Sequence, residues 1–430
     1  RVVRVASLVV LIIIFAPFGQ VLAEDDDGSA PVFVNDVMKS YSRTVQTAFE
    51  RVSDMEMYDE DSLDEVNSWL VVTGMAIEDH HDSEAKPDDS EPVAVLKGSY
   101  IWTFDNPGTA VEVLTKSLEK GEIESFSPLI EKVFSPKFEP NDPYFDDQWH
   151  LYNSGQTSGV AGEDANVMGV WDSFNGSGVV ISVIDDGVEH SHPDLSDNYV
   201  SVHSYDWCGD DSDPDPNSSD GHGTAVAGVA AGTGNNSIGV TGAAFGASIA
   251  GHRLIACGFS DSTGADALSY HNGGIDIYSN SWGPFDSGDI LDGPGPITIA
   301  AIEDSVYNGR SGLGNIYTWA AGNGLDADDN SNYDGYSNSR YSIAVAAITH
   351  YGEQSWYSEP GANILVTAHS NGGSPNYEGI TTTDITGNGG YDGGDVTHDF
   401  GGTSSATPLV SGVIALVLEA NPDLTWRDVQ

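Results

Sequence analysis

Three short motifs contain residue types that could together perform nucleophilic catalysis. Asp185 ends an apolar run and is followed by Asp-Gly, His222 lies within Gly-His-Gly-Thr, and Ser404 lies within Gly-Thr-Ser. A serine hydroxyl is a weak nucleophile until a histidine removes its proton, and that histidine needs a carboxylate to fix its tautomer and stabilise the imidazolium. The residue types and their positions therefore predict a catalytic triad of Asp185, His222 and Ser404.

The elements around these motifs predict an α/β fold. Residues 178–184 are almost wholly apolar, as in a strand that is buried on both faces. Similar runs occur at 247–254, 275–279, 314–320 and 342–348, and helical patterns at 225–231 and 297–307 lie between them. Strands that alternate with helices indicate a parallel sheet flanked by helices. Such a sheet carries its chemistry at the carboxyl ends of its strands, where the three motifs are expected.

The composition excludes several classes of function. The chain has 430 residues, with 66 Asp and Glu against 15 Lys and Arg, for a formal net charge of −51. Nucleic-acid binding and docking on anionic lipid both need basic patches, so this charge argues against both. The charge favours cationic partners, divalent metals or a saline habitat. Two cysteines, Cys208 and Cys257, exclude a multiple-disulfide scaffold, and whether these two pair is left open.

The first 23 residues have the pattern of a secretory signal peptide. Arg1 and Arg4 precede an apolar run that extends to Phe18, and Val21-Leu22-Ala23 ends in small residues. A membrane anchor is the alternative, but the run is shorter than the ~20 residues that a span needs. We expect a secreted protein with no membrane association in its mature form. Because no Met begins the chain, we expect its start to be truncated.

Residues 24–140 form an acidic region that ends in a small predicted module. A strand is expected at 93–104, a helix that opens at Pro107 carries an apolar stripe, and a second strand is expected at 126–134. This α+β pattern, at about 90–137, resembles an inhibitory pro-domain. We therefore expect this pro-region to bind the larger domain at 141–430 as its inhibitor.

Further stretches across residues 142–430 match, together with the three motifs, a known family of enzymes. They are Asp142-Pro143, Gln148-Trp149, 281–284, 321–324, 334–336, 356–359 and 418–430. With the three motifs, they resemble the subtilisin-like serine peptidases, and among these the kexin and furin type of proprotein convertase. The resemblance implies that Asp185 orients His222, that His222 acts as base and acid, and that Ser404 attacks the peptide carbonyl. It also implies that Asn323 donates to the oxyanion.

Two further implications concern the nucleophile and the end of the chain. The family has a proline four positions after its serine, and Pro408 selects Ser404 over Ser405. Members of this type continue into a β-rich P domain. We therefore expect the domain at 141–430 to be incomplete at its C-terminus.

The same resemblance implies pockets for basic substrate residues. A substrate Arg or Lys needs carboxylate partners when it is desolvated. By matching positions, Asp334 and Asp286 would line the pocket for the substrate residue just before the scissile bond. Asp186 would serve the substrate residue one step further upstream. Asp292 and Tyr336 would help to shape the pocket for the substrate residue four positions upstream. Ser281, Trp282 and Gly283 are also expected to bind substrate. Two family acids are replaced by Ser219 and Gly264, so strict dibasic selectivity is left open.

Calcium is the cofactor that the resemblance implies, because hard oxygen ligands suit Ca²⁺. One site would use Asp142, Asp194 and Asn236 with the carbonyls of Thr233, Ile238 and Val240. A second site would use Asp286, Asp329 and Glu359. A third would use Asp206, Asp213 and Asp215.

The leading interpretation is a secreted, calcium-dependent serine endopeptidase that cleaves peptides or proteins after Arg or Lys. A degradative subtilisin-like protease of broad specificity is one alternative, and the acidic pocket residues argue against it. A non-catalytic peptide-binding member of the fold is the other. Such a protein would have no need of an oxyanion donor at Asn323.

Overall fold

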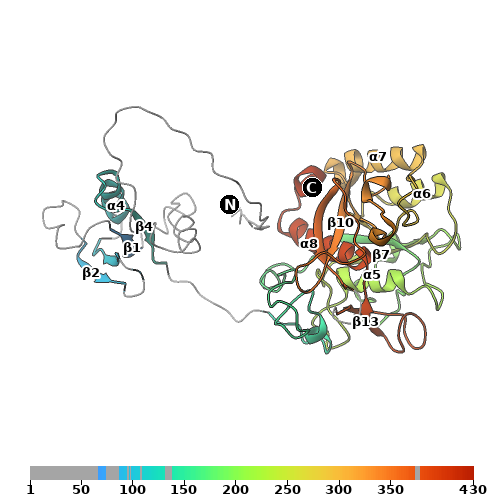
Figure 1. Ribbon diagram of the computed structural model, residues 1–430, viewed down its shortest axis with the longest axis horizontal. Helices are drawn as coiled ribbons and strands as arrows, with labels where there is room; N and C mark the ends of the chain where they lie inside the picture. The colour runs from blue at the N-terminus through green and yellow to red at the C-terminus, as the bar shows by residue number, and fades with distance from the viewer. Residues whose placement is uncertain are drawn as a thin grey trace. The chain divides into compact units, whose positions relative to one another are not determined.

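The computed structural model describes residues 66–73, 87–93, 96, 98–106, 109–130, 138–372 and 378–430. The predicted signal peptide lies outside these residues. The described chain forms two compact units, at 66–130 and at 138–430, each of which is considered by itself (Figure 1).

The smaller unit is an antiparallel sheet with one helix. The strand order is β2-β3-β1-β4, and the helix is α4. The bounds are β1 Ser68–Val72, β2 Asp89–Pro92, β3 Ser99–Thr103, α4 Ala110–Glu119 and β4 Ser125–Pro128. Trp69 of β1 and Leu114 of α4 are fully buried in its core with Phe126.

The expected strand, helix and strand are present in the smaller unit, but its expected start near residue 90 was too late. β1 lies at the centre of the sheet and pairs with both β3 and β4. The sheet could not form without it, because β3 and β4 do not pair with each other. β1 is a single five-residue run within acidic sequence, which gave no periodic signal.

The larger unit is built on a seven-stranded sheet in which every neighbouring pair is parallel. The strand order is β11-β10-β9-β8-β5-β7-β6. The bounds are β5 Val180–Asp185, β6 Tyr205–Asp206, β7 Ser248–Arg253, β8 Ile277–Asn280, β9 Ile316–Ala320, β10 Ser342–Ile348 and β11 Ile364–His369. β12 Ile380–Thr383 and β13 Val396–Phe400 form a separate antiparallel pair. The predicted α/β class is confirmed.

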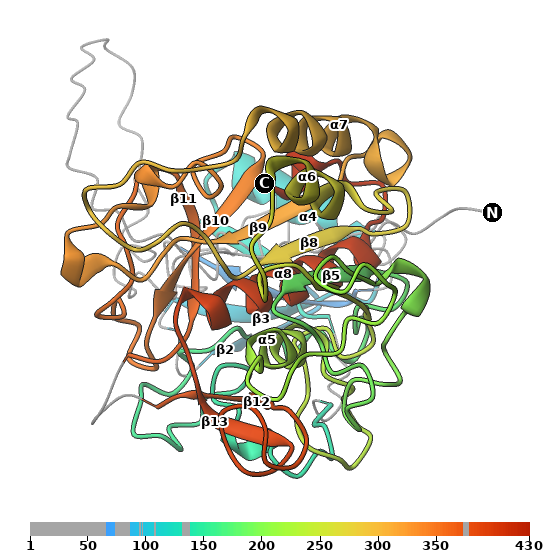
Figure 2. The ribbon, with the colours of Figure 1, turned by 90° about the vertical axis from the view of Figure 1, so that its right-hand side faces the viewer.

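Helices cover both faces of the seven-stranded sheet (Figure 2). α6 and α7 pack on one side, and α5 and α8 pack together on the other, with α8 against β8, β9, β10 and β11. The bounds are α5 His222–Ala231, α6 Asp261–Ser269, α7 Pro296–Gly312, α8 Thr403–Ala420 and α9 Trp426–Val429. Short 3₁₀ turns lie at Phe145–Asp147, Ser201–His203, Leu325–Ala327 and Ser331–Tyr333.

Glycines allow α5 to approach the end of β5 closely. A Cβ on Gly223 would clash with the carbonyl oxygen of Gly187, and one on Gly228 would clash with Thr383 of β12. Nearly every residue of α5 is buried, and most are Ala, Gly or Val. The start of the helix is thereby held against the turn that follows β5.

One helix in the described ranges, α8, is long and apolar enough to cross a membrane, but 72% of it is buried inside the unit. Its side chains belong to the core beneath β8–β11. α8 is thus accounted for as the central core helix of the larger unit.

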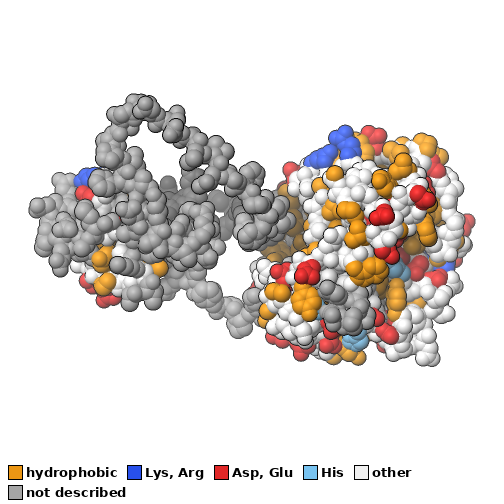
Figure 3. Space-filling view, in the orientation of Figure 1, with side chains coloured by type: hydrophobic (Ala, Val, Ile, Leu, Met, Phe, Trp, Pro, Cys, Tyr) orange, Lys and Arg blue, Asp and Glu red, His pale blue; other side chains and the backbone are white. Residues whose placement is uncertain are grey.

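Acidic side chains are spread over the visible face of the larger unit, and basic side chains are few there (Figure 3).

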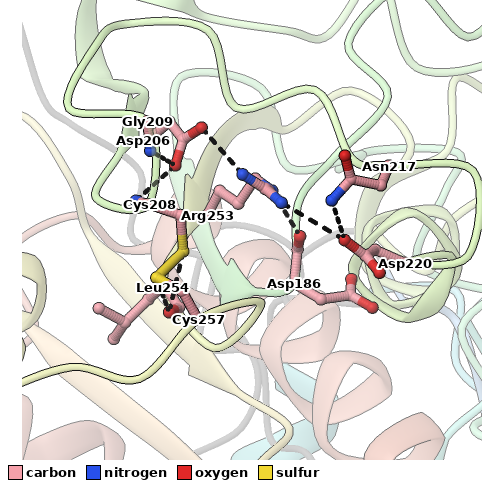
Figure 4. The surroundings of a disulfide bond; sticks show 9 residues. All are labelled: Asp186, Asp206, Cys208, Gly209, Asn217, Asp220, Arg253, Leu254 and Cys257. Carbon is pink, nitrogen blue, oxygen red and sulfur yellow. Dashed lines mark hydrogen bonds and ion pairs between the residues drawn. A yellow bond between two sulfur atoms is a disulfide. The ribbon is translucent and has the colours of Figure 1, made fainter.

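Cys208 and Cys257, whose pairing the sequence left open, form a disulfide. Their sulfur atoms are 2.10 Å apart and their Cα atoms are 5.8 Å apart (Figure 4). The bond joins the loop after β6 to the loop after β7, and disulfides persist mainly in oxidising compartments.

Candidate active site

Asp185 and His222 form the first half of the predicted triad. Asp185 is the last residue of β5 and is fully buried, and His222 is the first residue of α5. His222 Nδ1 lies 2.8 Å from Asp185 Oδ1. A histidine held in this way presents Nε2 as the basic nitrogen, which is the tautomer that a general base needs.

The negative charges beside His222 stabilise its protonated form. Asp185 Oδ2 is buried and has no hydrogen-bond partner within the described residues. Burial lowers the pKa of His222, but the charge of Asp185, its hydrogen bond and the charge of Asp186 together outweigh burial and hold the pKa above its ordinary value. The imidazolium that would form during catalysis is therefore stabilised.

Ser404 lies in the first turn of α8, two residues after Gly402, whose φ of 76° suits glycine. Its hydroxyl donates to the carbonyl oxygen of Ser281 (3.1 Å), and Ser281 Oγ donates to the carbonyl oxygen of Ser404 (3.0 Å). Attack on a substrate requires the Ser404 hydroxyl to exchange this partner for His222 Nε2. Catalytic hydrogen bonds often form only once substrate is bound.

Asn323 is oriented as an oxyanion donor would be. Its Oδ1 accepts hydrogen bonds from the backbone N–H of Thr403 (2.8 Å) and from Thr403 Oγ1 (3.0 Å). Because Oδ1 is fixed in this way, the side-chain nitrogen Nδ2, which donates to no described residue, remains available as a donor. Asn323 and Ser404 line the same cavity.

That cavity has a volume of about 220 Å³ and is rich in carboxylates. Asp286, Asp329, Asp334 and Glu359 line it together with Ser404. The expected substrate-binding residues Ser281, Trp282 and Gly283 line it as well. The predicted nucleophile Ser404, the predicted donor Asn323 and four carboxyl groups therefore line one hollow at the carboxyl end of the sheet.

Comparison with known sequences agrees with this geometry. The sequence model of the Subtilase family matches residues 176–430. The chain belongs to the subtilase family. Relatives include a PC3-like endoprotease of Hydra vulgaris, which is 44% identical over 299 residues that cover 68% of this chain and 41% of the relative. Neuroendocrine convertase 2 of Rattus norvegicus is 42% identical over 297 residues, 67% of this chain and 45% of the relative.

These similarities place this subtilase in the kexin and furin, or proprotein convertase, type. Furin-like protease 2 of Drosophila melanogaster is 44% identical over 293 residues, which cover 67% of this chain and 17% of the relative. The chain spans less than half the length of these curated relatives.

Solved structures also resemble this subtilase. A serine protease of Aeromonas sobria has a TM-score of 0.62 at 28% identity, covering 69% of this chain and 58% of that one. A protease of Pseudoalteromonas arctica has a TM-score of 0.55 at 29% identity, covering 67% and 90%.

The expected pocket residues divide between two neighbouring hollows. Asp334 lies in the Ser404 cavity beneath Gly283, where an added Cβ would lie 3.0 Å from its Oδ2. Burial raises the pKa of Asp334 to about 6. Asp292 and Tyr336 line the adjacent hollow, and Asp292 pairs with Asp334 in a short parallel bridge. The Tyr336 ring stacks on Trp319 with centroids 4.9 Å apart.

Asp186 lies beside the triad with its carboxylate engaged by the helix start. Its two oxygens accept the backbone N–H groups of His222 (3.2 Å) and Gly223 (2.7 Å). Burial and the nearby charge of Asp185 raise its pKa to about 7. Asp186 therefore caps α5 in addition to any contact with substrate.

The residues of the second expected calcium site are assembled in the Ser404 cavity. Carboxylate oxygens of Asp286, Asp329 and Glu359 lie within 4.8 Å of one another. Asp329 and Glu359 are buried, and burial raises the pKa of Glu359 to about 8. Gly322 has a φ of 106°, and a Cβ there would clash with Glu359 Oε1. This donor set fits Ca²⁺, which takes oxygen ligands.

The first expected site is also assembled. Asp142 and Asp194 are buried, and Asn236 Nδ2 lies 2.8 Å from Asp194 Oδ1. Burial raises the pKa of Asp142, and it raises the pKa of Asp194 to about 6. The carbonyl oxygens expected as ligands, those of Thr233, Ile238 and Val240, accept no hydrogen bond from any described residue. Two buried carboxylates and three free carbonyls fit Ca²⁺.

The third expected site is not assembled. Asp206 Oδ2 forms an ion pair with Arg253 (3.2 Å), and its Oδ1 accepts the N–H groups of Cys208 and Gly209 (Figure 4). The ion pair satisfies the Asp206 charge without a metal. Asp213 and Asp215 lie elsewhere and gather around His190. The third calcium site therefore stays a prediction, and in this structure its three Asp side chains do not form one ligand cluster.

Sequence reasoning missed two residues that shape the site. Arg253, which ends β7, donates to the carbonyl oxygen of Asp186 (3.2 Å) and pairs with Asp220 (3.4 Å) as well as Asp206. Phe400 packs edge-on against His222 with centroids 5.4 Å apart. The one early signal was the rarity of Arg in so acidic a chain, since a basic residue at a strand end must have acidic partners.

Removing the oxyanion donor tests the site directly. We expect Asn323→Ala to lower kcat about 10²–10³-fold with little change in KM, because the amide acts on charge that develops in the transition state. Ser404→Ala should abolish turnover of a peptide substrate. Ser405→Ala is the matched control, since Ser405 Oγ is buried against Ser370 Oγ (2.7 Å). Full activity of Ser404→Ala together with loss in Ser405→Ala would contradict the assignment.

The pH profile tests the charge around His222. The general base must be neutral, and its pKa is raised, so kcat/KM should rise with pH through a value above the ordinary ~6.5 of histidine. Rates with a saturating and a limiting substrate concentration would define the limb, and thermal unfolding at each pH would show that the protein stays folded. An acid limb clearly below pH 6 would contradict the raised pKa.

Proposed function

We propose that this chain is a secreted, calcium-dependent serine endopeptidase that cleaves peptides or proteins after Arg or Lys. The carrying observation is that Ser404 and half-buried Asp334 line the same cavity as Asp286. A buried carboxylate whose pKa is raised gains most from a cationic partner. An Arg or Lys side chain of a substrate would supply that partner.

The chemistry follows from the triad. His222 Nε2 would accept the proton of Ser404 as Oγ attacks the substrate carbonyl, and would later donate it to the leaving amine. Asn323 would donate to the oxyanion while Asp185 stabilises the imidazolium. Water would then attack the acyl group on Ser404. His222 would accept the proton of this water and donate it to Ser404 Oγ as the product leaves.

Calcium would act on structure in this proposal. Asp142, Asp194 and Asn236 would hold one ion, with carbonyls of the 233–240 loop, and Asp286, Asp329 and Glu359 would hold another beside the substrate pocket. Bound Ca²⁺ would neutralise buried carboxylates there. The ions would keep the pocket walls in place rather than take part in bond breaking.

Export and maturation complete the proposal. The N-terminal signal pattern and the Cys208–Cys257 disulfide support an oxidising, extracytoplasmic location. The α+β unit at 66–130 would be the inhibitory pro-domain, and the unit at 138–430 the catalytic domain. Single or dibasic preference depends on Asp186, whose carboxylate already caps α5.

A panel of fluorogenic peptides ending in Arg-Arg, Lys-Arg, Ala-Arg and Ala-Phe tests the proposed function. We expect turnover of the basic peptides only, lost on chelation and restored by calcium. Asp334→Asn should lower kcat/KM for Ala-Arg about 10–100-fold, as expected for the loss of a hydrogen bond to a charged group. Asp289→Asn, a change at an exposed Asp outside the cavity, should have no effect.

Two outcomes would overturn parts of this proposal. Equal cleavage after Phe would leave a protease of broad specificity. Binding of the peptides without turnover, by folded protein freed of residues 1–137, would indicate a non-catalytic peptide-binding protein.

A further inference from the structure

The loop between β12 and β13 lies against the start of α5, beside the predicted triad. The N–H of Gly390 donates to the carbonyl oxygen of Ser218 (2.9 Å), which joins this loop to the segment before α5. Gly221 directly precedes His222. A Cβ on Gly221 would lie 3.0 Å from Gly390 Cα and 3.7 Å from Tyr391 Cδ2. The loop therefore brings the ring of Tyr391 to the edge of the active site.

A buried carboxylate fixes the conformation of this loop. Asp384, which follows β12 and is fully buried, accepts with Oδ2 the backbone N–H groups of Tyr391 (2.8 Å) and Asp392 (2.7 Å). Its Oδ1 accepts the N–H of Ile385 (2.8 Å). The backbone of Tyr391 is thus held in place, while its side chain is 50% exposed and accessible to a substrate.

Tyr391 and Phe400 form an aromatic wall beside His222. The ring centroids of Tyr391 and Phe400 are 5.8 Å apart, and Phe400 lies 5.4 Å from the His222 ring. Neither residue of the wall lines the Ser404 cavity. The aromatic wall therefore borders the site outside the pocket proposed for the residue just before the scissile bond.

The hydroxyl end of Tyr391 lies close to Asp186. Burial raises the pKa of Tyr391, and among the nearby charges that raise it further, that of Asp186 has the largest effect. Such an effect requires the phenol oxygen and the carboxylate to be near each other. Asp186 also accepts the first N–H groups of α5, against which the Tyr391 ring lies. A cation bound to Asp186 would therefore contact this ring.

Asp220, the other carboxylate drawn near Asp186 in Figure 4, already has partners of its own. Its Oδ2 accepts hydrogen bonds from Asn217 (2.8 Å) and Arg253 (3.4 Å). Its Oδ1 accepts one from Ser219 Oγ (3.0 Å). Because these donors offset the charge of Asp220, a substrate cation at Asp186 needs a different second source of stabilisation.

We propose that Tyr391 is that second source and selects Arg as the substrate residue two positions before the scissile bond. This inference rests on the proposed cleavage after Arg or Lys. The Asp186 carboxylate would balance the guanidinium charge, and the face of the Tyr391 ring would stack on the guanidinium plane. Arg makes such cation–π contacts more often than Lys, because its planar group stacks on aromatic faces.

Cleavage of Arg-Arg, Lys-Arg and Ala-Arg fluorogenic peptides by the parent chain and by Tyr391 variants tests the inference. We expect Tyr391→Leu to lower the ratio of kcat/KM for Arg-Arg to that for Ala-Arg about 3–10-fold, because leucine fills space but has no ring face. The ratio of Lys-Arg to Ala-Arg should fall less. Tyr391→Phe keeps the ring and should keep the parent's preference for Arg-Arg.

Tyr152→Leu is the matched control, since Tyr152 is 44% exposed and lines neither the Ser404 cavity nor the adjacent hollow. Its peptide preferences should equal those of the parent. Equal losses on all three peptides in Tyr391→Leu would overturn the inference, because they would indicate a purely structural role of the loop.

A second series of internally quenched peptides varies the residue after the scissile bond. Selectivity that Tyr391→Leu changes only in this series would place the ring on the leaving-group side and would also overturn the inference. Failure of the proposed function is a separate result, since the parent itself would then cleave Ala-Phe as fast as Ala-Arg. That result would overturn both proposals.

Discussion

The hydrogen bond between His222 Nδ1 and Asp185 Oδ1 sets a demanding condition for the whole fold. It joins the end of a buried strand to the first residue of a helix 37 positions later, across 2.8 Å. The condition is met because Gly223 lets the helix start meet the turn at Gly187 without a clash. The carboxylate of Asp186 then caps the same helix start. Small residues throughout α5, and the packing of α8 beside it, hold this arrangement in the core.

A second theme is buried negative charge. Burial raises the pKa of Asp334, Asp194, Asp186 and Glu359, of which Asp334 and Glu359 share the Ser404 cavity. A positively charged partner would stabilise the ionised form of each of these carboxylates and lower its pKa. The protein itself supplies few, and Arg253 is the clearest example, since it serves Asp206, Asp220 and the carbonyl oxygen of Asp186. Substrate side chains and metal ions are the remaining sources of positive charge in our account.

Much of the fold and the triad could be predicted from the sequence, because buried parallel strands are continuous apolar runs and because Asp185, His222 and Ser404 stand at strand or helix ends. β1 could not be predicted, since five residues carry too little pattern and its place depends on two distant strands. The ion pair between Asp206 and Arg253 could not be predicted from the sequence either. The distance between these two residues depends on pairing between β6 and β7, which the residue spacing does not reveal.

The central claim is that Ser404 is a nucleophile served by an acidic pocket. Its most direct test is covalent labelling with aryl phosphonates that carry an Arg side chain or a Phe side chain, followed by peptide mass spectrometry. We predict a phosphonyl adduct on Ser404 alone, formed faster with the Arg reagent and absent in Ser404→Ala. An adduct at another residue, or equal rates with the two reagents, would contradict the account.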